Sequence, residues 1–339
     1  MSRSHRAPIL CGPPARAKSA YRLRRVLTMR NLAMTIAVAA ALAACATPTE
    51  ETVAAEAAVV GSSSPLMTWG ELTGRPLPAP SSTHAYGDDP AQVADLWLPD
   101  GPSPHPVVLM VHGGCWQKAI ADRTLMNYAA EDLRRRGLAV WNVEYRGVDE
   151  AGGGYPGTYL DVARAAERLR EAGPDLGLDT GRVAALGHSA GGHLVAWLAT
   201  QGNIADGTPL AGKPLDYAVV IVSGGLADLE ASEPVTLPSC LADIRTDLVG
   251  RADATRDDIY ADTSPARLLP ARVPLVSVNG ERDRIAPPKL GIGFTERAMA
   301  AGGDARYVEI PGAGHVELVA PATEAWNTQA DLLEAALKD

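Results

Sequence analysis

The sequence has few aromatic residues, few cysteines and little positive charge. Aromatic residues are 5% of the 339 residues, with a single phenylalanine, so binding of nucleic-acid bases by stacking is not expected. The net charge of -9 also argues against a polyanionic partner. Seven histidines form no H-E-x-x-H or H-x-H pattern, and four cysteines show no C-x-x-C spacing. We therefore expect no catalytic metal, no cofactor and no nucleic-acid partner.

Acidic residues are missing from the first 44 residues, which carry eight arginines and lysines. The apolar run over 31–44 that ends this segment is shorter than the ~20 residues that a membrane-spanning helix needs. A basic segment followed by such a run is typical of a signal peptide. The run ends in Leu42-Ala43-Ala44-Cys45, which resembles the lipobox of bacterial lipoproteins. An ordinary signal peptide that happens to end in cysteine is the alternative, and Met29 is an alternative start.

These features predict three parts. Residues 1–45 form a signal peptide with a lipobox, residues 46–64 a flexible tether, and residues 65–339 a single folded domain. The resemblance to lipoproteins implies an exported, periplasmic or cell-envelope protein whose only membrane contact is a lipid anchor at Cys45.

Beyond residue 65, short apolar runs alternate with segments of helical spacing. The expected strands are Gln92–Leu98, Pro106–His112, Leu138–Tyr145, Arg182–Gly187, Tyr217–Ser223, Pro274–Asn279 and Ala305–Ile310. The expected helices are Arg123–Arg136, Thr158–Ala172, Ala190–Thr200, Pro287–Ala301 and Ala322–Leu337. This alternation predicts an α/β fold with a mostly parallel central sheet and helices on both faces. Functional residues should then follow the carboxyl ends of the strands.

A nucleophile motif lies where such a fold would need it. Gly187-His188-Ser189-Ala190-Gly191 matches G-x-S-x-G, between an expected strand and an expected helix. Small residues around the serine allow the tight strand-to-helix turn that exposes its hydroxyl. Amides at the helix N-terminus favour negative charge that develops nearby. We therefore identify Ser189 as the candidate nucleophile.

A second glycine-rich segment follows another strand. His112-Gly113-Gly114-Cys115-Trp116 resembles the H-G-G-x-W loop of carboxylesterases and arylformamidases, which are α/β-hydrolases. The resemblance implies an oxyanion hole formed by the backbone N–H groups of Gly114, Cys115 and Ala190. It also implies that Trp116 supports this loop rather than contacting substrate. Many esterases have a third glycine where this chain has Cys115, so the pocket should be narrower.

The serine needs a base, and the base needs a carboxylate that orients it. In this fold the chain order is serine, acid, histidine. His315 is the only histidine that follows Ser189 outside its own helix, because His193 lies four residues into that helix and is expected to pack there. Residues 278–287 resemble the family's acid loop, in which an aspartate precedes an apolar residue and a proline. The resemblance implies that Asp283 is the acid, with Glu281 as the alternative. Glu317 is too close to His315 in the sequence to orient it easily.

Two further patterns are weak, and one is absent. Gly152–Gly157 matches G-x-G-x-x-G formally, but Pro156 stands where a helix should open, so dinucleotide binding is not expected. There is no P-loop pattern. Cys115 could be taken for a nucleophile, but in this loop its backbone matters more than its thiol.

The predicted function is that of a serine carboxylesterase. Ser189 would form an acyl-enzyme with a small-molecule ester, and water would cleave it. Glu144-Tyr145-Arg146, Gly154–Gly157 and Asp161 resemble the feruloyl-esterase and arylformamidase branch of the family. An arylformamidase-type amide hydrolase and a catalytically silent binding protein on the same fold are the two alternatives. The sequence does not show which alcohol forms the ester substrate, nor the oligomeric state of the protein.

Cys115 and Cys240 are the two cysteines of the expected catalytic domain. Cys240 lies in a long stretch between two strands, residues 226–269, which could form a small lid. If both loops emerge at the same end of the sheet, the two cysteines can form a disulfide in an oxidising compartment; two free thiols are the alternative. In either case we expect the insertion to cover Ser189 and to limit the size of the acyl pocket, so that short acyl chains are preferred.

The lipoprotein interpretation predicts where a Cys45 variant is found. If the sulfur of Cys45 carries the lipid, Cys45→Ser should move the protein from the membrane fraction to the soluble fraction of fractionated cells, because serine cannot form the thioether. Equal retention of the variant in the membrane fraction would indicate an uncleaved anchor instead.

Overall fold

The structure, a computed structural model, describes residues 65–338. The predicted signal peptide, Cys45 and the predicted tether lie outside the described residues. Within 65–338, no helix is both long enough and apolar enough to span a bilayer.

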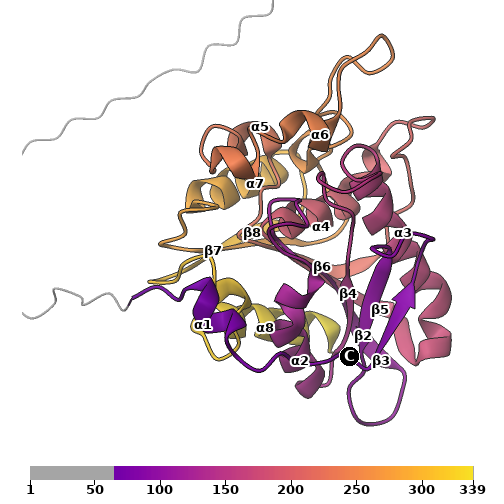
Figure 1. The fold of residues 1–339 in the computed structure, drawn as a ribbon, viewed down its shortest axis with the longest axis vertical. Helices are drawn as coiled ribbons and strands as arrows, with labels where there is room; N and C mark the ends of the chain where they lie inside the picture. Colours follow the sequence, from indigo (N-terminus) through magenta and orange to yellow (C-terminus); the bar gives the residue numbers. More distant parts are fainter. Residues whose placement is uncertain (1–64, 339) are drawn as a thin grey trace, which may run out of the picture. The chain divides into compact units, whose positions relative to one another are not determined.

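A mostly parallel eight-stranded sheet forms the centre of the described part (Figure 1). The strand order is β1-β2-β4-β3-β5-β6-β7-β8, and only the pairs β1–β2 and β2–β4 are antiparallel. This arrangement confirms the predicted fold class. The strands are β1 (Ser82–Ala85), β2 (Val93–Trp97), β3 (His105–Val111), β4 (Ala139–Val143), β5 (Leu178–His188), β6 (Tyr217–Ser223), β7 (Leu275–Gly280) and β8 (Ala305–Ile310).

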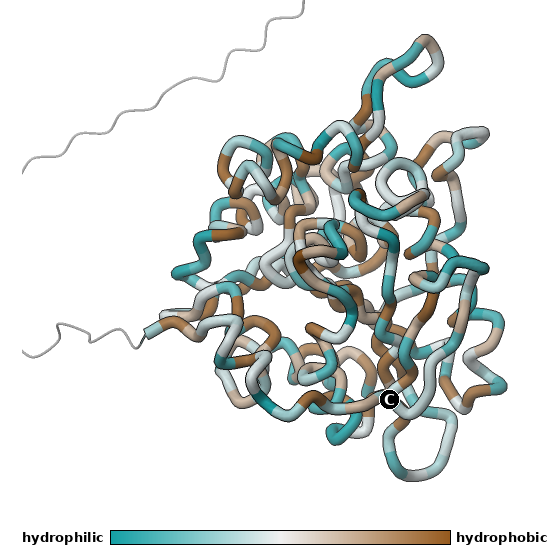
Figure 2. The backbone as a smooth tube through the Cα atoms, viewed as in Figure 1, coloured by the Kyte–Doolittle hydropathy of each residue, from teal (hydrophilic) through white to brown (hydrophobic). Residues whose placement is uncertain are grey.

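Helices cover both faces of the sheet. Alternate residues of β3 belong to two separate cores: Val107 and Leu109 pack with α3, α4 and α7, whereas Val108 and Met110 pack with α2 and α8. Burial on both faces explains why the strands read as continuous apolar runs, which Figure 2 shows in the interior. The helices are α1 (Trp69–Thr73), α2 (Asn127–Arg135), α3 (Gly157–Ala172), α4 (Ala190–Thr200), α5 (Leu229–Ser232), α6 (Arg245–Val249), α7 (Pro288–Ala300) and α8 (Glu324–Leu337).

Two elements near the start of the described chain were not predicted. β1 is a four-residue edge strand with mostly exposed side chains, so it lacks the apolar alternation that marks a strand. α1 has five residues, too few for a helical period to show. Its signal is a capping box, in which the Thr68 side chain accepts from the Glu71 amide and Glu71 accepts from the Thr68 amide.

The glycines of 152–157 are required by close backbone packing. A Cβ atom on Gly153 would lie 1.7 Å from the Gly147 carbonyl oxygen, and one on Gly157 would lie 1.7 Å from that of Gly152. The segment therefore has a packing role in the turn before α3.

The insertion between β6 and β7 contains α5, α6 and a short 3-10 helix, η5 (Pro238–Cys240). Leu248 and Val249 of α6 belong to the same core as α3 and α4. The Asp247 carbonyl oxygen accepts from the Tyr155 amide at 2.8 Å. The insertion is thus packed onto the body of the domain.

Candidate active site

Ser189 lies on a sharp turn between β5 and α4. Its backbone has φ 54° and ψ -117°, a left-handed φ that side chains rarely adopt. The Ser189 amide donates to the Ser223 carbonyl oxygen of β6 at 2.9 Å, so the turn continues the sheet's hydrogen bonding by one residue. The next residue, Ala190, opens α4. This is the strand–turn–helix geometry that presents a nucleophilic serine.

Three glycines make room for this turn. A Cβ atom on Gly191 would lie 2.1 Å from the Val111 carbonyl oxygen, and one on Gly187 would lie 2.1 Å from that of Gly191. A Cβ atom on Gly192 would lie 2.7 Å from the Gly225 Cα atom. Any larger residue would push α4 away from the strands and would displace the serine at its N-terminus.

His315 and Asp283 lie together at the carboxyl ends of β8 and β7. The Nδ1 atom of His315 donates to Asp283 Oδ2 at 2.6 Å. The other oxygen of Asp283 accepts from the Ile285 and Ala286 amides at 2.8 and 2.9 Å. The carboxylate is thus buried and fixed by three donors, and the His315 Nε2 atom is left as the acceptor.

The two other carboxylates considered from the sequence have structural contacts. Glu281 Oε2 accepts from the Gly312 amide at 2.7 Å. Glu317 accepts from the Gly314 amide at 3.0 Å and from the Met67 amide at 2.6 Å. Both hold the loop that carries His315, and neither is bonded to its ring.

The glycine-rich loop after β3 has left-handed backbone angles at three successive residues. Gly114, Cys115 and Trp116 have φ values of 107°, 52° and 54°. The Gly114 and Cys115 amides donate to no acceptor within residues 65–338. Ala190 is the first residue of α4, so its amide also has no partner within the helix. These are the three amides predicted to form the oxyanion hole.

A cluster of charged groups surrounds the buried Glu144 carboxylate next to this loop. His112 Nε2 donates to Glu144 at 3.0 Å, and His112 Nδ1 donates to the Gly113 carbonyl oxygen at 2.6 Å. Lys118 Nζ and an Arg123 guanidinium nitrogen contact the other Glu144 oxygen at 2.9 and 3.3 Å. Burial would raise the pKa of Glu144, but the charges and hydrogen bonds of His112 and Lys118 outweigh it and lower the pKa to about 2.

His193 supports the same loop from α4. It accepts from the Trp116 indole nitrogen through Nδ1 at 3.1 Å and donates through Nε2 to the Thr263 carbonyl oxygen at 2.8 Å. Burial lowers the pKa of His193 to about 4, which agrees with a neutral ring that accepts at one nitrogen. Trp116 is fully buried. The expected packing of His193 and the supporting position of Trp116 are therefore what the structure shows.

His188, next to the serine, contacts the loop of His315. Its Nε2 atom donates to the His315 carbonyl oxygen at 3.2 Å, and the two rings lie 4.4 Å apart. Burial, followed by the nearby charge of His315, lowers the pKa of His188 well below its ordinary value. A neutral His188 ring can donate this hydrogen bond from Nε2.

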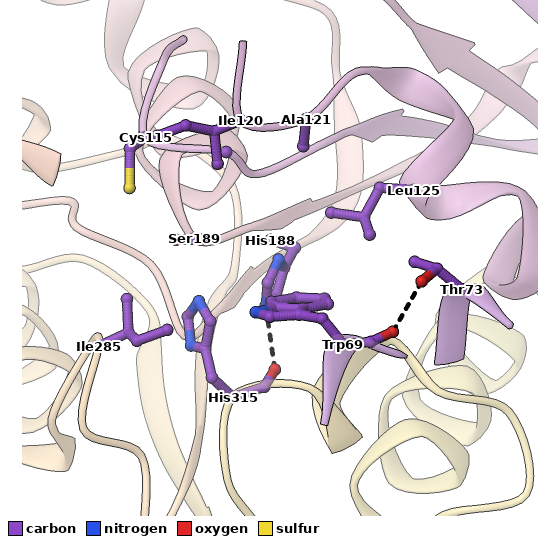
Figure 3. A pocket seen from close by; sticks show the side chains of 11 residues that line it. Trp69, Thr73, Cys115, Ile120, Ala121, Leu125, His188, Ser189, Ile285 and His315 are labelled. Carbon is purple, nitrogen blue, oxygen red and sulfur yellow. Dashed lines mark hydrogen bonds between the residues drawn. The ribbon is translucent and has the colours of Figure 1, made fainter. Parts of the chain in front are cut away.

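Ser189, His315, Gly114 and Cys115 line one cavity of about 290 Å³ (Figure 3). This volume is near the small end of ligand pockets. The walls are mostly apolar. The centroid of the Trp69 ring lies 6.0 Å from that of His188 and 6.3 Å from that of His315, with the rings edge to face. The remaining lining residues are Thr73, Ile120, Ala121, Leu125, His188 and Ile285.

The sequence did not indicate the part played by the segment before β1. Trp69 and Thr73 come from α1, a helix that was not predicted, and no local pattern shows that it reaches the cavity. The expectation for the insertion is also corrected: none of residues 226–269 is among those that line the cavity. The insertion instead contacts two of the lining residues, Cys115 through the disulfide of Cys240 and Ile285 through a hydrogen bond from Thr236.

Cys115 and Cys240 form a disulfide, with Cα atoms 4.7 Å apart. The sequence left this pairing open. Because its sulfur is bonded to Cys240, Cys115 has no free thiolate that could act as a nucleophile. Within residues 65–338 no group of histidine, cysteine and acidic residues is arranged to hold a metal ion.

A serine, an imidazole fixed by a buried carboxylate and unpaired amides in one small apolar cavity can perform acyl transfer. Comparisons with known proteins agree with this chemistry. The model of the BD-FAE family matches residues 94–297. Esterase LipC of Mycobacterium tuberculosis is 30% identical over 237 residues, which are 68% of this chain and 58% of LipC. This chain therefore matches less than two thirds of that relative.

Solved structures of esterases have the same fold. Esterase LipW from Mycobacterium marinum has 20% identity and a TM-score of 0.60, with 76% of this chain and 82% of that chain covered. Esterase B from Lactobacillus rhamnosis has 20% identity and a TM-score of 0.63, with 76% and 86% covered. At these identities the likeness shows the fold alone. Trp69 and Thr73 lie outside the residues that the family model matches.

The charged cluster next to the glycine-rich loop predicts a pH-dependent stability. Because the pKa of Glu144 is about 2 in the folded chain, below its ordinary 4.5, the stabilisation is present above about pH 4.5 and is lost towards pH 2. Glu144→Gln should lower the free energy of unfolding at pH 7 by about 3 kcal/mol. The difference in melting temperature between wild type and Glu144→Gln should shrink as the pH falls from 6 to 3. Asp100→Asn, at an exposed carboxylate, is the control; a deficit for Glu144→Gln that stays constant with pH would contradict the account.

Proposed function

Because this chain belongs to the BD-FAE family of α/β-hydrolases, we propose that it is a serine esterase that hydrolyses small carboxylic esters through an acyl-enzyme on Ser189. The observation that carries the proposal is that Ser189, His315 and the glycine-rich loop line one cavity, with Asp283 bonded to the His315 ring behind it. Ser189, the His315–Asp283 pair and the unpaired amides of the glycine-rich loop come from four separate segments. Packing alone would not require this combination.

In the proposed mechanism, His315 acts first as a base. Its Nδ1–H is held by Asp283, so Nε2 is the nitrogen that takes the proton from the Ser189 hydroxyl. The serine oxygen then attacks the ester carbonyl carbon. No hydrogen bond joins the Ser189 hydroxyl to the His315 ring within residues 65–338, and such contacts commonly tighten only when substrate is bound.

The negative charge that develops on the carbonyl oxygen is placed at the amides of Gly114, Cys115 and Ala190. His315 then returns the proton to the leaving alcohol, and the acyl-enzyme remains. Water, deprotonated by the same imidazole, then attacks the acyl carbon. The bond from this carbon to the Ser189 oxygen breaks, the imidazole returns its proton to that oxygen, and the acid is released. The protonated imidazole that forms in each step is stabilised by the buried Asp283 carboxylate.

The cavity walls suggest which acyl groups are accepted. Ile120, Leu125 and Ile285 give the cavity an apolar lining, and its volume of about 290 Å³ leaves little room beyond a short chain. We propose short acyl chains of about C2 to C6 as substrates, because burial of each CH₂ contributes about 0.8 kcal/mol only while it fits.

We also propose that the protein is exported. The sequence before residue 46 has the pattern of a signal peptide, and the Cys115–Cys240 disulfide supports the proposal because such bonds persist in oxidising compartments.

The proposed triad predicts the effect of three substitutions. Ser189→Ala and His315→Ala should lower kcat for p-nitrophenyl butyrate by roughly 10⁴-fold or more, and Asp283→Asn by a smaller factor. Glu281→Gln is the matched control for the acid, because its side-chain oxygen can still accept from the Gly312 amide. Near-full activity of Ser189→Ala, or a larger loss for Glu281→Gln than for Asp283→Asn, would refute the assignment.

The cavity predicts an order among substrates. The kcat/KM should be highest for p-nitrophenyl acetate or butyrate and should fall by about tenfold or more for palmitate, because the long chain has no apolar site within the cavity. A maximum at palmitate would show that the protein is a lipase.

A further inference from the structure

A five-residue segment of the insertion contacts both loops that flank the serine. Residues 236–240, which we call the brace segment, precede α6 and include η5. Cys240 is joined to the glycine-rich loop, and Thr236 is bonded to the loop that carries Asp283. The brace segment contributes no side chain to the cavity itself. Its contacts with the site therefore act through other residues.

The first contact is made to the glycine-rich loop at two points. Cys240 forms the disulfide with Cys115, one of the proposed oxyanion donors. Two residues further along the loop, the Gln117 side chain donates to the Ser239 carbonyl oxygen at 2.8 Å. The backbone on either side of Trp116 is thus tied to the brace segment.

The second contact is made to the acid loop. The Thr236 hydroxyl donates to the Ile285 carbonyl oxygen at 3.0 Å. Ile285 in turn donates its amide to Asp283 Oδ1 at 2.8 Å and lines the cavity with its side chain. Thr236 therefore acts on the residue that both holds the catalytic carboxylate and forms a cavity wall.

The glycine-rich loop needs external support because its conformation is unfavourable. Cys115 and Trp116 both have a left-handed φ, which side chains adopt only when their surroundings hold them there. An oxyanion hole stabilises a transition state because its amides are fixed in advance, so a loop that relaxes would lose this effect. The disulfide acts directly on one of the two strained residues.

The brace segment is itself held in place by the body of the domain. Cys240 and Leu241 are each 1% exposed and belong to the same core as α3 and α4. The Cys240 amide donates to the Leu237 carbonyl oxygen at 2.8 Å, which closes the segment on itself. A segment anchored in this way can fix the position of a loop bonded to it.

We propose that the brace segment sets the position of the oxyanion donors relative to the acid loop, with Cys240 and Thr236 as positioning residues for ester hydrolysis. The inference rests on the proposed function, because its catalytic readout is the esterase activity. Loss of the disulfide leaves the triad intact and lets the Cys115 amide move, so kcat falls while substrate binding in the apolar cavity is kept.

The experiment compares the oxidised chain with Cys240→Ala and Thr236→Val. Cys240→Ala should lower kcat for p-nitrophenyl butyrate by about tenfold or more and should change KM by less than about twofold, a smaller loss than the 10²–10³-fold that removal of an oxyanion donor costs. Thr236→Val, which keeps the side-chain shape, should lower kcat by a smaller factor. Leu237→Ala is the matched control, because Leu237 lies in the same segment with a side chain that is 55% exposed and should leave kcat unchanged.

A transition-state analogue separates positioning from general stability. An alkyl trifluoromethyl ketone forms a tetrahedral adduct with a serine and places an oxyanion in the hole. Its inhibition constant should rise in Cys240→Ala by the same factor by which kcat/KM falls. A variant that melts at a lower temperature but keeps kcat and the inhibition constant within about twofold of wild type at 25 °C would overturn the proposal.

Reduction of the wild-type chain tests the same point without a substitution. A dithiol gives two electrons and two protons to the disulfide, which yields the Cys115 and Cys240 thiols and the cyclic oxidised reagent. The kcat should fall as in Cys240→Ala and should return when the chain is reoxidised. This arm remains decisive if the variant does not fold.

Amide hydrogen exchange keeps the inference distinct from the proposed function. The Gln117 amide donates to the Gly114 carbonyl oxygen at 2.9 Å and reports whether the turn is closed. Its exchange should accelerate on reduction while that of α4 does not change. If the oxidised chain hydrolyses no ester, the proposed function fails; if exchange at Gln117 is the same in both redox states, the brace proposal fails.

Discussion

The close approach of α4 to the strands is the constraint on which the site depends. Gly187, Gly191 and Gly192 have no room for a Cβ atom, so the helix starts directly at the carboxyl ends of β3 and β5. This contact forces the left-handed turn at Ser189 and leaves the first amide of the helix, that of Ala190, without a partner in the helix. The loops after β3, β7 and β8 then meet the serine because the parallel strands end at the same edge of the sheet. The packing of α4 against the strands and the position of the nucleophilic serine thus depend on the same few backbone atoms.

Four histidines lie at or near the site, and their partners give each a different role. His193 is neutral, accepts from the Trp116 indole nitrogen and supports the glycine-rich loop. His188 is neutral and holds the backbone of the loop that carries His315. Both nitrogens of His112 face oxygen acceptors, so its ring links the Gly113 carbonyl group to the buried Glu144 carboxylate. Only His315 among these four has a carboxylate at Nδ1 and a face in the cavity beside Ser189. The three other rings keep the surrounding loops in place.

Much of this arrangement could be predicted from the sequence, because the fold's strongest signals are local. The apolar runs gave the interior strands, and G-x-S-x-G between a strand and a helix gave the turn that carries Ser189. The pairing of Asp283 with His315 followed from the chain order of the family and from the resemblance of residues 278–287 to its acid loop. Contacts between distant segments left no such signal. Three features depend on the packing of segments far apart in the sequence. They are the approach of Trp69 to the cavity, the disulfide, and the contact of the insertion with the acid loop.

The central claim is that Ser189 is a nucleophile activated by His315 and assisted by the surrounding amides. Reaction of the folded chain with a fluorophosphonate, followed by peptide mass spectrometry, tests this most directly, because the reagent modifies a serine only where a base and an oxyanion hole act on it. The account predicts one equivalent of label, on the peptide that contains Ser189, with parallel loss of esterase activity. A chain that hydrolyses esters yet takes up no label, or takes it up at another residue, would contradict the account.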